Sequence, residues 1–229
     1  MRSSIRLATL WCSLVVSASL TSCSTSPAAP SRPVSEAGAT VRQVVVLGDS
    51  LAVSPSNAEN FPTALQQRLD AAGYRWRIVN AGVVGAVTAD GVRRLESVLT
   101  SDGGIVVLEL GANDGLRGIP TETVEQNLAT MIEGAQARGI RVLLCGMETP
   151  PAHGLAYTVA FHRLFPGLAT RYGVALVPFL LAGVVLNSSL NGPDGIHPNA
   201  AGSRLIAETV WPYLERLIQQ TPAATGKAS

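Results

Sequence analysis

Charge is scarce in this chain of 229 residues and lysine is almost absent: charged residues make up 14%, and Lys227 is the only lysine among 17 basic residues. The 16 acidic residues leave a formal net charge of +1. Without a basic excess to neutralise phosphates, nucleic acid is excluded as the main partner. Hydrophobic residues make up 47%, which excludes intrinsic disorder and is enough for a full core. At roughly 100–200 residues per domain, the length allows one domain with short additions.

Cysteine is equally scarce, with three residues in the chain. Cys12 and Cys23 lie in the first part of the sequence, and Cys145 lies inside the largely apolar run 140–146. If the first two belong to a leader and an anchor, one cysteine remains and no intramolecular disulfide can form. We expect Cys145 to be a buried structural thiol, and a nucleophilic role is the weaker alternative.

The apolar run over 7–20 has only 14 positions, whereas a membrane-spanning helix needs about 20. Arg2 and Arg6 precede this run, which gives the layout of a secretory signal peptide over 1–22. The run ends in Leu20-Thr21-Ser22-Cys23, which resembles the lipobox of bacterial lipoproteins and implies a lipid on Cys23. An ordinary signal peptide with an incidental cysteine is the alternative. Ser24 fits sorting to the outer membrane if the cell has two membranes.

Residues 24–40 are rich in Pro, Ser and Ala and have no apolar periodicity. As a flexible linker, these 17 residues span about 23 Å. We therefore expect a signal peptide over 1–22, a lipidated cysteine and tether over 23–40, a globular domain over 41–220 and a disordered tail over 221–229. The protein is expected to be exported and held on the membrane of the bacterial cell envelope by a lipid anchor on Cys23, facing the periplasm.

Short apolar runs alternate with longer amphipathic stretches from Val41 onward. The runs predict strands over 41–48, 75–80, 104–110, 140–147 and 174–177. The amphipathic stretches predict helices over 61–72, 89–99, 121–138 and 200–219, with Thr121 as a cap and Gly139 as a stop. Such alternation is typical of an α/β protein, a three-layer α/β/α sandwich with a central parallel sheet of about five strands and a flavodoxin-like order. Ligands of such sheets bind at the carboxyl ends of the strands.

Four polar clusters follow predicted strands or precede the last helix: Gly48-Asp49-Ser50-Leu51, Asn80 with Gly82 and Gly85, Gly111-Ala112-Asn113-Asp114-Gly115, and Asp194 to Asn199. Accessible glycine N–H groups and an asparagine amide are the donors that an oxyanion needs. Taken singly, each cluster has a simpler explanation, such as a serine helix cap, loop punctuation or a surface histidine.

The last cluster brings a base and a carboxylate close together in the sequence. A serine hydroxyl is a weak nucleophile until a base takes its proton, and the base must be held in the right tautomer by a carboxylate. Asp194 lies three residues before His197, close enough to orient its ring directly. His153 and His162 have no carboxylate at comparable spacing, so we expect them at the surface or in helix packing.

In their order and position, the four clusters together resemble the GDSL or SGNH hydrolase family, most closely its bacterial arylesterase, acyl-CoA thioesterase and lysophospholipase branch. The third cluster differs from that branch by one Gly-to-Ala change, at Ala112. The resemblance implies Ser50 as nucleophile, His197 as general base and then acid, and Asp194 as the orienting carboxylate. It also implies an oxyanion hole built from the Ser50 N–H, the Gly85 N–H and the Asn113 side chain. The sequence shows no metal-ligand cluster and no phosphate-binding glycine loop, so no cofactor and no metal are expected.

The expected function is that of a serine esterase, which hydrolyses small carboxylic esters or thioesters through an acyl-serine intermediate. A carbohydrate O-deacetylase of the same fold is the first alternative. A non-catalytic binding lipoprotein is the second, and the complete set of triad and oxyanion residues speaks against it. The apolar segment 178–190 could line an acyl groove, but a short helix packed on the sheet is the favoured interpretation.

Overall fold

Five parallel strands form one sheet in the order β2-β1-β3-β4-β5. The structure, a computed structural model, describes residues 41–99 and 104–221. The strands are β1 (Arg42–Gly48), β2 (Trp76–Asn80), β3 (Ile105–Glu109), β4 (Arg141–Cys145) and β5 (Ala175–Val177). This order is that of the flavodoxin-like doubly wound sheet. The predicted sheet is therefore confirmed.

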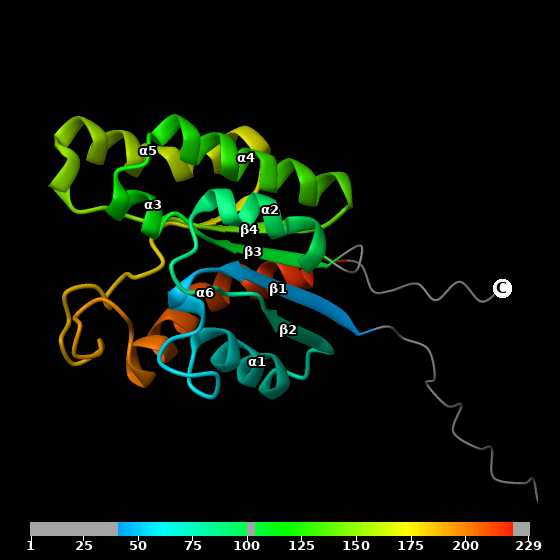
Figure 1. The fold of residues 1–229 in the computed structure, drawn as a ribbon. Helices are drawn as coiled ribbons and strands as arrows, with labels where there is room; N and C mark the ends of the chain where they lie inside the picture. Colours follow the sequence, from blue (N-terminus) through cyan, green and yellow to red (C-terminus); the bar gives the residue numbers. More distant parts are fainter. Residues whose placement is uncertain (1–40, 100–103, 222–229) are drawn as a thin grey trace, which may run out of the picture. The chain divides into compact units, whose positions relative to one another are not determined.

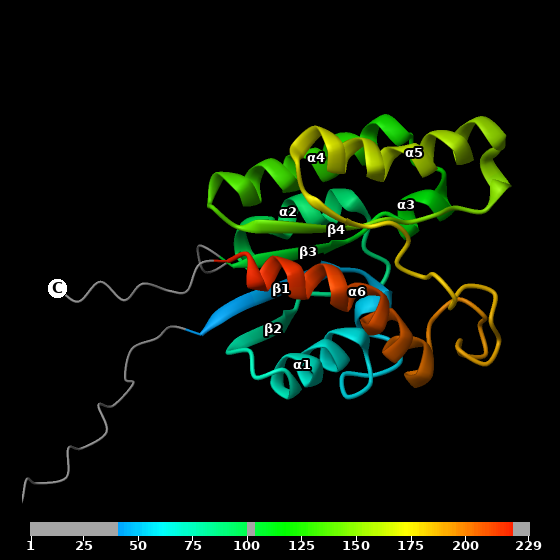
Figure 2. The ribbon, with the colours of Figure 1, turned by 180° about the vertical axis from the view of Figure 1, so that it is seen from behind.

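Helices cover both faces of the sheet, as Figures 1 and 2 show. On one face lie α1 (Phe61–Ala71) and α6 (Ala200–Gln219), and on the other lie α2 (Thr88–Val98), α4 (Thr121–Ala137) and α5 (Leu155–Tyr172). Three shorter elements follow strands: the 3-10 helices η1 (Ser50–Ala52) and η2 (Pro151–His153), and the helix α3 (Ala112–Arg117). The three-layer α/β/α architecture is thus confirmed.

The central strands are buried along their length because helices cover both of their sides. In β1 the residues 44–48 are buried, and all five residues of β3 are buried. Glu109, the last residue of β3, is the one charged residue in these buried stretches. Cys145, at the end of β4, is a buried free thiol, as expected.

The structure departs from the sequence-based prediction in α5, which was not expected. Pro166 lies inside this helix, and a proline in a helix interior removes a hydrogen bond and normally argues against one. Burial of one face, including Phe161 and Phe165, holds the helix together across the proline. The cap of α4 also differs: Pro120 precedes the helix and Thr121 is its first residue.

The segment over 178–190 forms turns and not the short helix that was favoured. Leu180 and Val184 are buried in the core, whereas Val185 and Leu186 are exposed. The prediction of packing is therefore confirmed for Leu180 and Val184, whereas the prediction of a short helix in this segment was wrong.

The predicted signal peptide, the lipidated Cys23, the tether and the tail beyond Thr221 lie outside the described residues. Within 41–99 and 104–221, no helix combines the length and the apolar character that crossing a membrane requires.

Candidate active site

Ser50 lies at the carboxyl end of β1, where the chain turns sharply into η1. Gly48, just before the turn, lets the Glu109 side chain approach the end of β1, because a Cβ at that position would lie 2.3 Å from Glu109 Oε2. The Leu51 N–H donates to Asp49 Oδ1 at 2.9 Å, so Asp49 caps η1. The alternative that Ser50 is the helix cap is therefore wrong, and its hydroxyl remains available for other partners.

The loop that holds His197 is an ordered hairpin that runs into α6. The Gly192 N–H donates to the His197 carbonyl at 2.8 Å, and the Asn199 N–H donates to the Leu190 carbonyl at 3.0 Å. Asn199 also caps α6, because its Oδ1 accepts from the N–H groups of Ala201 and Gly202 at 2.9 and 3.1 Å. Backbone pairing and a helix cap thus fix the position of His197.

Three side chains form one hydrogen-bonded chain across this edge of the sheet. The Ser50 Oγ lies 2.9 Å from His197 Nε2, although 147 residues separate the two. On the other side of the ring, His197 Nδ1 lies 2.6 Å from Asp194 Oδ2. The structure therefore brings together the serine, histidine and aspartate that the motifs singled out.

Asp194 uses both of its carboxylate oxygens in this loop. Oδ2 accepts from the His197 ring, and Oδ1 accepts from the N–H groups of Ile196 and His197, each at 3.0 Å. These hydrogen bonds, the one from the His197 ring first, hold the pKa of Asp194 below its ordinary value. An ionised Asp194 keeps the hydrogen on Nδ1 and leaves the Nε2 lone pair facing the Ser50 hydroxyl.

Gly85 lies in the loop between β2 and α2 with a φ of +75°, a conformation that favours glycine. Its carbonyl accepts a hydrogen bond from Arg117 Nη2 at 2.9 Å. Within the described part of the chain, no acceptor pairs with the backbone N–H of Gly85 or with that of Ser50. Both N–H groups are therefore free to meet a ligand oxygen.

Asn113 lies at the start of α3, and its amide is already engaged. Asn113 Nδ2 donates to Asp49 Oδ2 at 2.9 Å and to the Ala86 carbonyl at 3.1 Å. Because an amide nitrogen carries two hydrogens, a ligand oxygen must share or replace one of these acceptors. The Ala86 carbonyl, the longer of the two contacts, is the acceptor that such an oxygen would replace.

Two acidic side chains to which the sequence analysis gave no role lie directly behind this site. Asp49 is buried, and desolvation raises its pKa to about 6, while hydrogen bonds from Leu51 and Asn113 oppose that rise. Glu109 is also buried, and desolvation together with the nearby Asp49 raises its pKa well above the ordinary value. The sequence signal that could have revealed this pair was Glu109, a charged residue at the end of an otherwise apolar strand.

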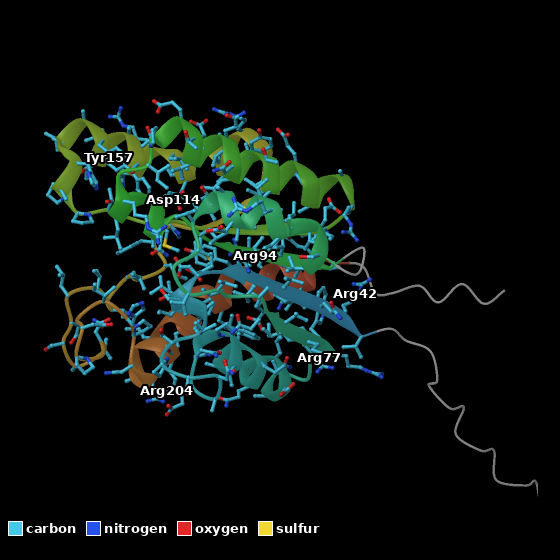
Figure 3. The ribbon with its side chains drawn as sticks, in the orientation of Figure 1. Arg42, Arg77, Arg94, Asp114, Tyr157 and Arg204 are labelled. Carbon is cyan, nitrogen blue, oxygen red and sulfur yellow. The ribbon has the colours of Figure 1, made fainter. Side chains whose placement is uncertain are left out.

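A ladder of aromatic rings supports α3 from the side of α5. Three glycines of the α3 segment each face one ring so closely that a Cβ would lie 2.7–3.0 Å from it: Gly111 faces Phe165, Gly115 faces Phe161 and Gly118 faces His153. Tyr157, the remaining ring of the ladder, donates from its hydroxyl to the Ile119 carbonyl at 2.8 Å. Figure 3 shows Tyr157 beside the α3 residue Asp114. This packing fixes α3 and with it Asn113.

The other two histidines lie at the surface, as expected. His153 packs its ring against Gly118, and its Nε2 lies 3.1 Å from the Leu116 carbonyl. His162 Nδ1 lies 2.6 Å from Glu148 Oε1, a partner 14 residues away that sequence spacing did not indicate. Over 41–99 and 104–221, no group of three or more His, Cys, Asp or Glu side chains is placed to hold a metal ion.

Comparison with known proteins gives the same family as the motifs. Residues 46–205 match the GDSL-like lipase/acylhydrolase family. Esterase TesA of Pseudomonas aeruginosa is 40% identical over 183 residues, which cover 79% of this chain and 91% of that protein. Thioesterase 1/protease 1/lysophospholipase L1 of Escherichia coli is 32% identical over 178 residues, which cover 76% and 84%.

A solved structure agrees with these relatives. The crystal structure of TesA matches the fold with a TM-score of 0.73 at 40% identity, and the match covers 77% of this chain and 99% of that chain. The relatives carry the names of ester- and thioester-hydrolysing enzymes, which confirms the expected class, a hydrolase of ester bonds. The chain therefore belongs to the GDSL-like lipase/acylhydrolase family, as its four motifs predicted.

Proposed function

We propose that this chain hydrolyses carboxylic esters or thioesters through an acyl intermediate on Ser50. The observation that carries the proposal is the hydrogen-bonded chain from Ser50 Oγ through the His197 ring to Asp194, with contacts of 2.9 and 2.6 Å. A serine becomes nucleophilic when a base accepts its proton and a third group orients that base. The same three roles are filled here by side chains from two loops at one edge of the sheet.

In the acylation step, Ser50 Oγ forms a bond to the carbonyl carbon of the substrate while its proton moves to His197 Nε2. The carbonyl π electrons move onto the carbonyl oxygen and form a tetrahedral oxyanion. When the oxyanion collapses, the bond to the alcohol or thiol breaks, and His197 returns the proton to that leaving group. Asp194 stays ionised throughout and stabilises the imidazolium that forms in between.

In the deacylation step, water takes the place of the leaving group. His197 removes a proton from the water as its oxygen attacks the acyl carbon, and the proton then passes to Ser50 Oγ as the acyl bond breaks. The products are the free acid and the regenerated serine. The half-exposed ring of His197 gives water direct access to this step.

The oxyanion is held by the N–H groups of Ser50 and Gly85 and by the Asn113 amide. Two of these donors have no acceptor among the described residues, and the third exchanges the Ala86 carbonyl for the developing negative charge. Donors aimed at charge that develops in the transition state are each worth about 3–4 kcal/mol. Three such donors would supply a large part of the rate enhancement of the proposed reaction.

Exposed apolar side chains flank the site and favour an acyl or aryl substrate over a sugar ester. Val84 precedes Gly85, Leu116 lies on α3 with Asn113, and Ile196 precedes His197. These side chains are 73%, 52% and 56% exposed. Burying them against an acyl chain releases about 25 cal/mol per Å² of apolar surface, whereas a sugar would need polar partners at the same places.

We also propose that Cys23 is lipidated and that it anchors the protein to the cell envelope, facing the periplasm. The support comes from the sequence, in which a short apolar run ends at Cys23 and a Pro-, Ser- and Ala-rich tether follows. Replacing the cysteine by Cys23→Ala should move the protein from the membrane fraction to the soluble fraction. An unchanged distribution between the two fractions would contradict the anchor.

The test of the esterase is hydrolysis of p-nitrophenyl esters from acetyl to long acyl chains by the wild type and by Ser50→Ala. We expect the wild type to be active and the variant to lose activity by about 10⁶-fold. Cys145→Ala is the control for the other candidate nucleophile, because Cys145 is a buried free thiol and the variant should remain active. Full activity of Ser50→Ala would overturn the proposal.

A further inference from the structure

We propose that Glu109 and Asp49 form a buried acid pair that holds one proton and one negative charge, and that this pair positions the Asn113 amide beside Ser50. The proton resides on Glu109 and the charge on Asp49. This inference rests on the function proposed above, because it assigns positioning residues to the same reaction.

Asp49 connects the nucleophile to the oxyanion donor through its two oxygens. Oδ1 accepts from the Leu51 N–H at 2.9 Å, in the turn that holds Ser50, and Oδ2 accepts from Asn113 Nδ2 at 2.9 Å. Both contacts require an acceptor, and hydrogen bonds to an ionised acceptor are roughly twice as strong as neutral ones. A negative Asp49 therefore fixes the turn and the amide together.

Glu109 lies below Asp49 at the end of β3 and has no exposed surface. Its Oε2 accepts from the Asp49 N–H at 3.1 Å, and the nearby Asp49 charge raises the pKa of Glu109. Its Oε1 is buried and has no hydrogen-bond partner among the described residues, although the nearby Ala52 N–H opposes the rise in the pKa of the carboxyl group. A proton on Oε1 makes this buried oxygen a donor, and the neighbouring Asp49 carboxylate is the acceptor that we assign to it.

The alternative, in which both groups are ionised, places two like charges close together inside the protein. Such charges cannot both persist at a buried site, so one of the two binds a proton. Glu109 binds it more tightly, because burial and the Asp49 charge raise its pKa well above normal, whereas the pKa of Asp49 rises only to about 6. The donors from Leu51 and Asn113 keep the negative charge on Asp49.

The charged and titratable groups around the pair agree with this distribution. On the Asp49 side, His197 lowers the pKa of Asp49 and Asp114 of α3 raises it. On the Glu109 side, Cys145 of β4 is a neutral buried thiol whose pKa is raised. Arg94 of α2 donates to the Gly48 carbonyl at 3.3 Å, so its guanidinium lies beside the turn.

A single charge serves the reaction better than two charges or none. One negative charge on Asp49 orients the Asn113 amide and attracts the imidazolium that forms on His197. A second charge on Glu109 would add repulsion against the developing oxyanion. With no charge, Asp49 would carry a hydroxyl donor and lose one of its two acceptor positions.

The first experiment measures protons taken up on folding, which does not depend on activity. Because the folded pKa of Glu109 is raised, the folded state binds more protons than the unfolded state above about pH 4–5, and the free energy of unfolding falls as pH rises. The free energy of unfolding is measured by denaturant titration at several pH values between about 5 and 8, and its slope against pH gives the number of protons taken up on folding. Glu109→Gln should take up about one proton fewer than the wild type. Glu96→Gln, at an exposed position on α2, is the matched control and should match the wild type. Equal pH dependence of Glu109→Gln and the wild type would overturn the inference.

The second experiment separates positioning from folding by kinetics in the full chain. The side-chain amide introduced by Glu109→Gln keeps an N–H donor toward Asp49 and an oxygen for the Asp49 N–H, so this variant should retain kcat within about threefold. Asp49→Asn keeps an oxygen for Leu51 but turns an N–H toward Asn113, so kcat should fall by about tenfold or more with little change in KM. In an Asn113→Ala background, the same Asp49→Asn change should cost less than about threefold. An equal cost in both backgrounds would contradict a role through Asn113.

A third measurement covers the case in which Glu109→Gln does not fold. Infrared spectroscopy of the wild type at pH 7 should show the C=O stretch of a protonated carboxylic acid, and its absence would overturn the inference. Ser50→Ala, measured in parallel, keeps the two proposals apart. Full activity of Ser50→Ala would remove the proposed function, whereas an inactive Ser50→Ala with no protonated carboxyl would remove only the acid pair.

Discussion

Gly202, in the first turn of α6, lies so close to Leu190 that a Cβ on Gly202 would be 2.1 Å from the Leu190 carbonyl oxygen. This close contact holds Leu190, at the start of the loop that carries His197, against the first turn of α6. Ser203, the next residue of α6, contacts the loop that follows Ser50, because its Oγ donates to the Ser54 carbonyl at 3.0 Å. The beginning of α6 therefore holds the histidine loop and the serine loop at a fixed separation.

Gly202→Ala should displace the Leu190 backbone and with it the loop that carries His197. A misplacement of about 1 Å in a catalytic group can cost about 10²-fold in rate, so we expect kcat to fall by roughly 10- to 100-fold. Gly167→Ala in α5 is the matched control, because nothing lies within 4 Å of the added methyl group. Steady-state kinetics with a p-nitrophenyl ester checks both variants, and a Gly202→Ala enzyme with wild-type kcat would show that the contact does not set the loop.

Asn113→Ala should lower kcat by about 10²- to 10³-fold, the usual cost of removing one oxyanion donor. The change removes both contacts of the amide, at 2.9 Å to Asp49 and 3.1 Å to Ala86. Thermal denaturation of the variant separates this catalytic loss from unfolding. A folded Asn113→Ala enzyme with an unchanged rate would exclude Asn113 from the oxyanion hole.

Asp194→Asn should lower kcat by about 10⁴-fold at neutral pH, because an amide N–H facing Nδ1 favours the tautomer whose Nε2 carries the hydrogen. The pKa of Asp194 is lowered in the folded state, so its ionised form persists as pH falls below its ordinary range. The ionised Asp194 contributes to the free energy of unfolding at every pH above the pKa that it has in the unfolded state. This contribution is lost only as pH falls through the lower pKa of the folded state. A pH–rate profile should therefore show no loss from Asp194 near pH 4, and a variant with more than a tenth of wild-type activity would argue against its orienting role.

The apolar side chains at the site should matter for long acyl chains and not for acetyl. Val84→Ser should raise KM for a long-chain p-nitrophenyl ester several-fold and leave the acetyl ester unchanged, because only the longer chain reaches the residue beside Gly85. Val41→Ser is the matched control, since Val41 is 54% exposed but precedes β1, at the opposite end of the strand from Ser50. Equal effects on acetyl and long-chain esters would place the acyl chain elsewhere.

Much of the fold was predictable because its strands are continuous apolar runs and its long helices, apart from α5, have a clear period. The start of α6 at residue 200 matches the prediction, and the predicted ends of β1 and α1 lie within one residue. The helix α5 was missed because Pro166 argues locally against a helix, while the burial that overrides it involves residues far away in the sequence. Tertiary packing, which a local pattern does not contain, decided that element.

The triad was predictable for a different reason, since each of its members stands in a short motif directly after a strand or directly before the last helix. The support of the site was not predictable in the same way. The contact from Asp49 to Asn113 joins residues 64 positions apart, and the contact from the Asp49 N–H to Glu109 joins residues 60 apart. Such pairs meet only because parallel strands bring their carboxyl ends to one edge of the sheet.

The most direct test of the central claim is the site of labelling by a fluorophosphonate, which reacts with activated serines by displacement of fluoride. We expect one adduct in the intact-protein mass spectrum, located on the peptide that contains Ser50, with no adduct in Ser50→Ala and slower labelling in His197→Ala. The His197 ring lies 2.9 Å from Ser50 Oγ, so its loss should slow the reaction by removing the base. An adduct on another serine, or labelling of Ser50→Ala at the wild-type rate, would contradict the account.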